Sequence, residues 1–336
     1  MTETSENQLV LASPLQCAAR WRLHHQVWGN GYPLEMYLKR EESLFEADFC
    51  RTAQRMWLLC KDSEILASCE TYRMTMAAMG TRGIVQALRG ETIASVVVDP
   101  RLRRQGYAGQ LLQLLLERLR FDGTHVATLY SDVGPSLYRQ AGFLLHPARE
   151  STRAVQGQSW PNHAEELGIG DVANVLANES EQVQAWLGFA PTLAVAEVAC
   201  AERVAWFHQR SQFRAWARGT PAPQVVGAQG PDGGYCLWTA DSVNPKVHIL
   251  VWRPISARDA AILTEAALAH GSELGLAEVI WWDADRDTGI DPYRQPQLQP
   301  QGAVGRARAE SLPMLAWLDS SPFPLLWAGI ERAGWA

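Results

Sequence analysis

The residues from Asp99 to Gly109 have the types and spacing of an anion-binding turn. A β-branched run, Ser95–Val98, leads into the basic segment Asp99-Pro-Arg-Leu-Arg-Arg-Gln-Gly-Tyr-Ala-Gly109, and a leucine-rich helical pattern follows. Successive backbone N–H groups in such a turn, together with the positive end of a helix, suit a pyrophosphate. Gly106 lets a phosphate approach the backbone closely, and Ala108 is small for the same reason. An ordinary strand–turn–helix with solvated arginines is the alternative, and neither GxxxxGK[ST] nor GxGxxG is present.

The elements around this turn alternate between strand and helix patterns, which predicts an α/β fold with a mixed sheet. We expect a central strand, crossover helix and strand at 91–98, 106–120 and 126–130. The other predicted strands are 8–12, 56–60, 65–74 and 143–146, the other helices are 15–28, 33–49 and 135–140, and 77–90 is expected to be a loop.

The composition changes after residue 150, which predicts two domains, 1–150 and 151–336. Eleven of the 14 tryptophans lie in the second part, and the net charge is +1 in the first and −7 in the second. The predicted order there is a linker at 154–170, helices at 171–187, 195–218, 256–274 and 325–333, strands at 224–228, 235–240, 247–253, 278–282 and 312–318, and a loop at 284–310.

The charge and apolar patterns exclude several classes of protein. No basic face indicates nucleic-acid binding, and no apolar run approaches the ~18 residues of a membrane span. The N-terminus has no secretory signal pattern, and the six cysteines show no paired spacing, so we expect reduced thiols in a cytoplasmic protein. The oligomeric state is not predicted.

The turn also carries a family motif. Arg103-Arg104-Gln105-Gly106-Tyr107-Ala108 resembles the [RQ]-x-x-G-x-[GA] acetyl-CoA motif of the GNAT acetyltransferases, and Tyr138-Arg-Gln-Ala-Gly-Phe143 resembles their Y-x-x-x-G-[FW] segment. Segments along most of the chain are similar to the fungal lysine acetyltransferases of lysine catabolism: 25–29, 34–42, 66–71, 130–134, 312–314 and 331–335.

The resemblance implies a GNAT fold followed by a second, GNAT-like C-terminal domain that shapes the substrate side. It implies acetyl-CoA as cosubstrate and the side-chain amine of free L-lysine, or a similar small cationic amine, as acceptor. The residues that it places at acetyl-CoA are Val96, Val97 and Val98, whose backbone N–H groups would polarise the thioester carbonyl, and Arg103, Arg104, Gln105, Gly106, Tyr107, Ala108, Gly109 and Ser131.

The same resemblance assigns roles in proton transfer. Tyr138 would protonate the departing thiolate, with a packing role as the alternative. Glu70, Glu91 or the terminal carboxylate of Ala336 would accept the proton of the amine, which has to be neutral before attack. Either glutamate could instead be a substrate anchor or a surface residue.

Trp28, Glu70 and Tyr72 are the predicted substrate-binding residues. The acidic, tryptophan-rich second domain could gather cations and add cation–π contacts, or it could simply have an acidic surface and a tryptophan-rich core. An antibiotic or protein lysine acetyltransferase and a non-catalytic acyl-CoA-binding module are the alternative functions.

Neither the histidines nor the acidic segments predict a metal site. His24 and His25 are adjacent and would point to different sides of a helix. Residues 283–289 resemble the start of a calcium loop, but the glycine is one position late and Arg294 replaces the bidentate glutamate. We expect a solvated acidic loop there.

Overall fold

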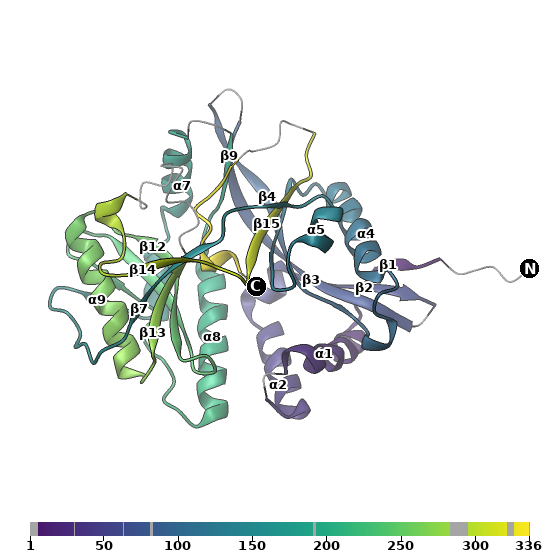
Figure 1. Cartoon of the computed structure of the whole chain (residues 1–336), viewed down its shortest axis with the longest axis horizontal. Helices are drawn as coiled ribbons and strands as arrows, with labels where there is room; N and C mark the ends of the chain where they lie inside the picture. The colour runs from purple at the N-terminus through teal and green to yellow at the C-terminus, as the bar shows by residue number, and fades with distance from the viewer. Residues whose placement is uncertain are drawn as a thin grey trace, which may run out of the picture.

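A computed structural model describes residues 6–29, 31–62, 64–80, 83–190, 193–282, 295–320 and 326–335. The chain forms two mixed β-sheets, each covered by helices, and the C-terminus lies between them (Figure 1). This confirms the predicted α/β class with mixed sheets. In the described part of the chain, every helix is too short or too polar to span a bilayer.

The first sheet has the strand order β1-β2-β3-β4-β5-β15-β6, and β9 and β16 extend it beside the far end of β3. The strands β4 and β5 are parallel to each other. The bounds are β1 Gln8–Leu11, β2 Gln54–Lys61, β3 Glu64–Met79, β4 Val85–Val98, β5 Val126–Ser131, β6 Leu144–Leu145, β9 Ala194–Glu197, β15 Leu312–Trp317 and β16 Leu326–Ala328.

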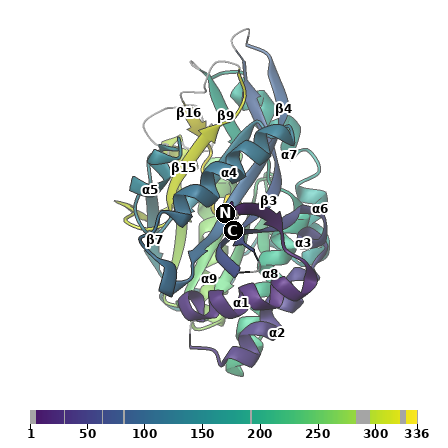
Figure 2. The same ribbon diagram turned by 90° about the vertical axis from the view of Figure 1, so that its right-hand side faces the viewer.

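Helices lie on both faces of the first sheet, as the turned view in Figure 2 also shows. The helices are α1 Pro14–Trp28, α2 Leu34–Phe45 and α3 Asp48–Ala53 on one face, and α4 Tyr107–Phe121 and α5 Ser136–Gln140 on the other. Ser13 caps α1 with a capping box to Gln16. Five of the six leucines of α4 are buried against the sheet at helical spacing, which fixes the start of this helix beside the end of β4.

The second sheet has the order β14-β7-β13-β12-β11-β10-β8. Its strands are β7 Arg149–Ala154, β8 Glu165–Leu167, β10 Gly227–Gln229, β11 Tyr235–Asp241, β12 Lys246–Arg253, β13 Glu278–Trp282 and β14 Val304–Ala307, and the helices beside it are α6 Val172–Val175, α8 Ala201–Arg218 and α9 Ala257–Glu273. The helix α7 Glu179–Leu187 packs instead against β3, β9 and β16 of the first sheet. Short 3-10 turns lie at Pro100–Leu102, Ile169–Asp171, Pro296–Leu298 and Arg332–Gly334.

One apolar core joins the two sheets. Phe49 and Tyr72 from the first part pack in the same cluster as Trp206, Leu237 and Leu250 from the second. Burial of apolar surface is the main stabilising contribution in folding. The division of the chain at residue 150 remains a prediction, and the two parts are held together by packing rather than by a linker alone.

Several predicted elements differ from the structure. The expected loop at 77–90 is instead the end of β3 and the start of β4, which continue as a hairpin. The expected helix at 33–49 breaks after Phe45 into α2 and α3. The start of the expected helix at 195–218 is the strand β9, and the expected terminal helix at 325–333 contains β16. Short apolar runs fit a buried strand as well as a helix, so periodicity alone could not separate them.

The first sheet is not complete at residue 150. The strand β15 lies between β5 and β6 and pairs antiparallel with both. Residues more than 160 positions beyond the start of the second part therefore form the strand next to the edge of the sheet that carries the predicted anion-binding turn.

Candidate active site

The parallel strands β4 and β5 separate at the end of their shared ladder. In the described residues their pairing runs from Gly90 with Val126 to Ile93 with Leu129 and then stops. At the same point β4 bulges at Ser95, which has a φ of 53°. The backbone of the predicted carbonyl-polarising residues, Val96–Val98, therefore follows the bulge and borders a gap between the strands.

The basic turn places free backbone donors beside this gap. Gly106 caps α4 in the left-handed region, with a φ of 86°, and α4 begins at Tyr107. The first N–H groups of a helix have no acceptor within it. A Cβ added to Gly106 would meet no atom within 4 Å, so the space in front of these donors is open. The turn at 103–109 thus has room for a pyrophosphate group, and its role in binding acetyl-CoA stays a prediction.

A cavity begins at the first turn of α4. It has a volume of about 300 Å³, lies between α4 and α5, and its lining includes Gly109, Leu116, Leu137 and Ala141. The groove therefore runs along α4 from Gly109, in its first turn, to Arg120, with Leu137 and Ala141 of the α5 segment as its other wall.

The predicted general acid, Tyr138, packs on the same face of the sheet as α4. Its side chain belongs to the apolar cluster that includes Val96 and Val98, and its ring contacts Phe143 edge-on. Burial raises the pKa of Tyr138 to about 12, and the nearby Cys69 and Asp132 add to the increase. The phenol therefore stays protonated at neutral pH and can donate its proton.

Glu70 and Tyr72, both predicted to bind substrate, lie together on the opposite face of the sheet. Arg20 donates to Glu70 Oε1 at 2.5 Å, and the Tyr72 hydroxyl donates to Oε2 at 2.8 Å. The Ser95 hydroxyl also donates to Oε2, at 3.3 Å. Glu70 is therefore bonded to the residue at the β4 bulge, and it is not a free surface carboxylate.

Sequence reasoning missed two members of this group. Arg20 is completely buried, and His24, one helical turn later in α1, is 2% exposed. The pKa of His24 lies well below its ordinary value, chiefly because of burial and also because of Arg20 and Arg40. The spacing of four residues between Arg20 and His24 on one helical face was the available signal.

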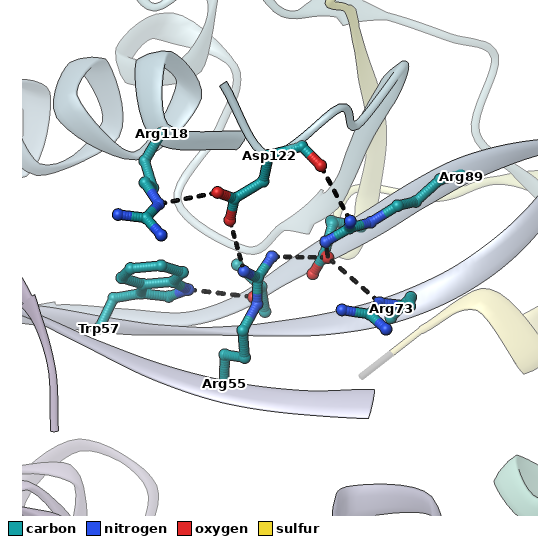
Figure 3. Close-up of polar contacts among 8 residues, drawn as sticks. Arg55, Trp57, Arg73, Arg89, Arg118 and Asp122 are labelled. Carbon is teal, nitrogen blue, oxygen red and sulfur yellow. Dashed lines mark hydrogen bonds and ion pairs between the residues drawn. The ribbon is translucent and has the colours of Figure 1, made fainter. Parts of the chain in front are cut away.

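Glu91 lies on the other face of the sheet, away from Glu70. Arg55 donates to its Oε1 at 2.7 Å and Arg89 at 3.2 Å, and Arg73 lies 4.0 Å away. Figure 3 shows these arginines converging below the end of α4, where Asp122 accepts from Arg55 at 2.7 Å. Glu91 is completely buried in this ion cluster. The cluster ties the start of the β4–β5 ladder to α4.

A larger cavity lies between the two sheets. Its volume is about 560 Å³, and its lining includes Trp28 from α1, Asp132 after β5, Trp282 from β13 and Trp335. Trp28, the third predicted substrate-binding residue, therefore borders this cavity, whereas Glu70 and Tyr72 are not part of its lining. The lining has six basic residues and four acidic ones. The basic residues are Arg210, Arg214, Lys246, Arg306, Arg308 and Arg332.

This lining corrects the expectation of an acidic, aromatic wall for a cation. Among the described residues, the surplus acidic charge of the second part does not line the cavity. The Arg308 guanidinium lies 3.6 Å from the Trp282 ring centre, and the Arg332 guanidinium lies 4.4 Å from that of Trp335. The cation–π partners of these tryptophans are thus the protein's own arginines.

The C-terminal segment connects the cavity to the strand gap. The Gly334 carbonyl accepts from Arg203 at 2.8 Å and from Thr92 of β4 at 3.4 Å. A Cβ added to Gly334 would approach the Tyr130 hydroxyl of β5 to 2.6 Å. Gly334 therefore contacts both parted strands, and Trp335 follows it into the cavity wall.

Three other predicted sites have different outcomes. Ser131 is buried and donates to the Gly134 carbonyl at 2.7 Å, so its hydroxyl shapes the turn before α5. Ala336 and the calcium-like segment 283–289 lie outside the described residues.

Parted parallel strands, an open glycine-capped turn and a tyrosine after β5 define an N-acetyltransferase of the GNAT class, whose domain uses acetyl-CoA. A model of the acetyltransferase (GNAT) domain matches residues 19–145, and a model of the LYC1 GNAT-like C-terminal domain matches residues 148–336. The second match covers more than half of the chain, and the chain belongs to this family. No curated protein sequence matches it.

Solved structures share the fold over most of the chain. A GCN5-related N-acetyltransferase from Kribbella flavida has a TM-score of 0.58 and 16% identity, covering 94% of this chain and 72% of that one. A probable N-acyltransferase from Enterococcus faecalis V583 has a TM-score of 0.58 and 13% identity, covering 93% and 73%. N-myristoyltransferase from Saccharomyces cerevisiae has a TM-score of 0.52 and 8% identity, covering 99% and 83%.

Proposed function

We propose that the protein transfers the acetyl group of acetyl-CoA to the side-chain amine of free L-lysine or a similar small amine. The observation that carries this proposal is the cavity of about 560 Å³ between the two sheets. Its volume suits a single small molecule. Gly334, Trp335 and Asp132 connect this cavity with the parted strands where acetyl transfer takes place in a GNAT domain.

The residues of the chain can each supply one part of the reaction. Acetyl-CoA, when bound, supplies the acetyl thioester, held by the turn at 103–109 and the groove beside α5. The backbone N–H groups of Val96–Val98 polarise the carbonyl at the gap. Tyr138 holds the proton that the leaving thiolate requires, since burial keeps its phenol protonated.

Of the three carboxylates predicted to accept the amine proton, we favour Glu70. It lies on the sheet face that α1 and α2 cover, and it bonds to Ser95 at the bulge. Glu91 lies on the α4 face and is enclosed by arginines. The six free cysteines are consistent with a reducing, cytoplasmic setting for the reaction.

The test is a CoA-release assay on the full chain with free L-lysine, a lysine-containing peptide and an aminoglycoside as acceptors. We expect turnover with lysine and little with the two larger acceptors, because a cavity of about 560 Å³ suits a single small molecule. Turnover on the aminoglycoside or the peptide without turnover on lysine would contradict the proposal. Binding of acetyl-CoA without turnover on any amine would indicate an acyl-CoA-binding module instead.

A further inference from the structure

Two arginines in the cavity wall lie on the faces of tryptophans. Arg210, on α8, lies 4.9 Å from the ring centre of Trp335 and 5.5 Å from that of Trp206. Arg332, in the last 3-10 turn, lies 4.4 Å from Trp335 and 4.9 Å from Trp282. Trp335 thus contacts both guanidinium groups, and stacking on its indole restricts the orientation of each.

These two arginines differ from three other cations of the cavity, each of which has a carboxylate partner. Arg214 pairs with Asp241 at 2.7 Å, Lys246 with Glu278 at 2.9 Å, and Arg306 with Glu150 at 2.7 Å. Within the ranges that the structure describes, neither Arg210 nor Arg332 forms an ion pair, and the Nε of Arg332 is buried without a hydrogen-bond partner.

The electrostatics of the pair also indicate a missing anion. Burial lowers the pKa of Arg210 to about 9, and the neighbouring Arg214 and Arg40 lower it further. Burial and Arg308 lower the pKa of Arg332 to about 10. Both groups are still charged at neutral pH. Both side chains are only partly exposed, so a bound anion would offset the cost of removing their charges from water.

We propose that Arg210 and Arg332 form a carboxylate-binding site, which holds the α-carboxylate of an amino-acid acceptor. Guanidinium groups match a carboxylate in shape and donor geometry. Arg332 lies two residues before Gly334, whose carbonyl bonds to Thr92 on β4. An acceptor held here by its carboxylate therefore has its side chain free to extend toward the parted strands.

This inference rests on the proposed function and makes it more specific. The pair favours an acceptor that carries a carboxylate, and it repels one that carries only positive charges. Among small amines, the site therefore selects amino acids over diamines and aminoglycosides.

The first experiment compares two acceptors that differ only in the carboxylate. L-lysine and 1,5-diaminopentane, which is lysine without its carboxylate, are assayed by CoA release. We expect the KM for lysine to be lower by about tenfold or more, the range for a hydrogen bond to a charged group. In Arg210→Gln and Arg332→Gln the KM for lysine should rise about tenfold or more, whereas the KM for the diamine should not rise.

Two further variants control this comparison. Arg210→Lys keeps the charge and should recover part of the preference for lysine. Arg218→Gln removes the same charge from an exposed position two turns further along α8, and it should leave both KM values unchanged. Equal KM values for the two acceptors in the parent protein, or equal losses for both in the variants, would overturn the inference.

The second experiment does not depend on turnover. Calorimetry in the presence of CoA measures the binding of L-norleucine and of pentylamine, its counterpart without a carboxylate. We expect norleucine to bind more tightly by about tenfold or more, and Arg210→Gln and Arg332→Gln to abolish that difference. If this holds but lysine is not acetylated, the proposed function fails and the carboxylate site stands. If norleucine does not bind, or binds no better than pentylamine, a segment of the chain itself occupies the arginines and the inference fails.

Discussion

Replacement of Glu91 by glutamine tests whether this residue stabilises the fold through its ion cluster or acts as the catalytic base. The change removes one negative charge from a completely buried position and keeps the size of the side chain. The Oε1 atom of Glu91 accepts from Arg55 at 2.7 Å and from Arg89 at 3.2 Å, so two charge-assisted hydrogen bonds weaken together.

The size of the loss in stability depends on the hydrogen bonds that Arg55 and Arg89 keep. A buried pair that loses one partner entirely costs about 3–5 kcal/mol. Here Arg55 still bonds to the Asp122 carboxylate at 2.7 Å, and Arg89 still bonds to the Asp122 carbonyl at 2.9 Å. We therefore expect the free energy of unfolding of Glu91→Gln to fall by about 2 kcal/mol, below that range. Since Glu91 lies on the face away from Glu70, kcat should stay within about twofold of the parent value.

Urea unfolding followed by circular dichroism measures the first quantity, and CoA release at 15 °C measures the second. Glu70→Gln is the matched variant, because it makes the same chemical change on the other face of the sheet. Its kcat should fall by about a hundredfold or more if Glu70 accepts the proton. A hundredfold loss of kcat in Glu91→Gln with stability unchanged would refute the assignment of Glu91 to structure.

Three other predictions test the remaining parts of the site and the fold. Tyr138→Phe should lower kcat by about a hundredfold with unchanged acetyl-CoA affinity, whereas Tyr32→Phe, which removes a hydroxyl without a hydrogen-bond partner in the described chain, should change neither. Gly106→Glu should abolish acetyl-CoA binding in calorimetry, since it forces a carboxylate and a strained backbone into the phosphate turn; retained binding would show that the turn is not the phosphate site. Burial lowers the pKa of His270 from 6.5 to about 4, so its contribution to stability is present above pH 6.5 and is lost as the pH falls toward 4. Between pH 7 and pH 5 the free energy of unfolding, measured with urea, should therefore fall by about 2 kcal/mol less in His270→Leu than in the parent protein. Equal decreases in the two proteins would contradict this.

The local parts of the site could be predicted from sequence. The turn at 103–109 and the helix α4 depend on neighbouring residues, because glycine, arginine and leucine spacing determines a cap and a buried face within one segment. The separation of β4 from β5 belongs to the same strand–helix–strand unit. Tyr138 follows it by a short connection, which is why its position beside Val96 could be anticipated.

The rest depends on contacts between distant segments. The ion pair of Arg20 with Glu70 joins residues 50 positions apart, and β15 joins β5 across about half the chain. Counting charges over residues 151–336 predicted an acidic wall, but a count does not say which side chains face the cavity. Arg210 and Arg332 come from α8 and from the last turn, and only the fold brings them to Trp335.

The insertion of β15 between β5 and β6 affects how the protein is made on the ribosome. The outer edge of β5 has no neighbour until Leu312–Trp317 has been synthesised. At about 5–20 residues per second, the interval after Ser131 lasts about 10–40 s. During that time the nascent chain exposes the open edge of a hydrophobic strand, which favours pairing with other chains. We therefore expect acetyl-CoA binding to begin only after β15 emerges, and chaperone occupancy to be highest before it does.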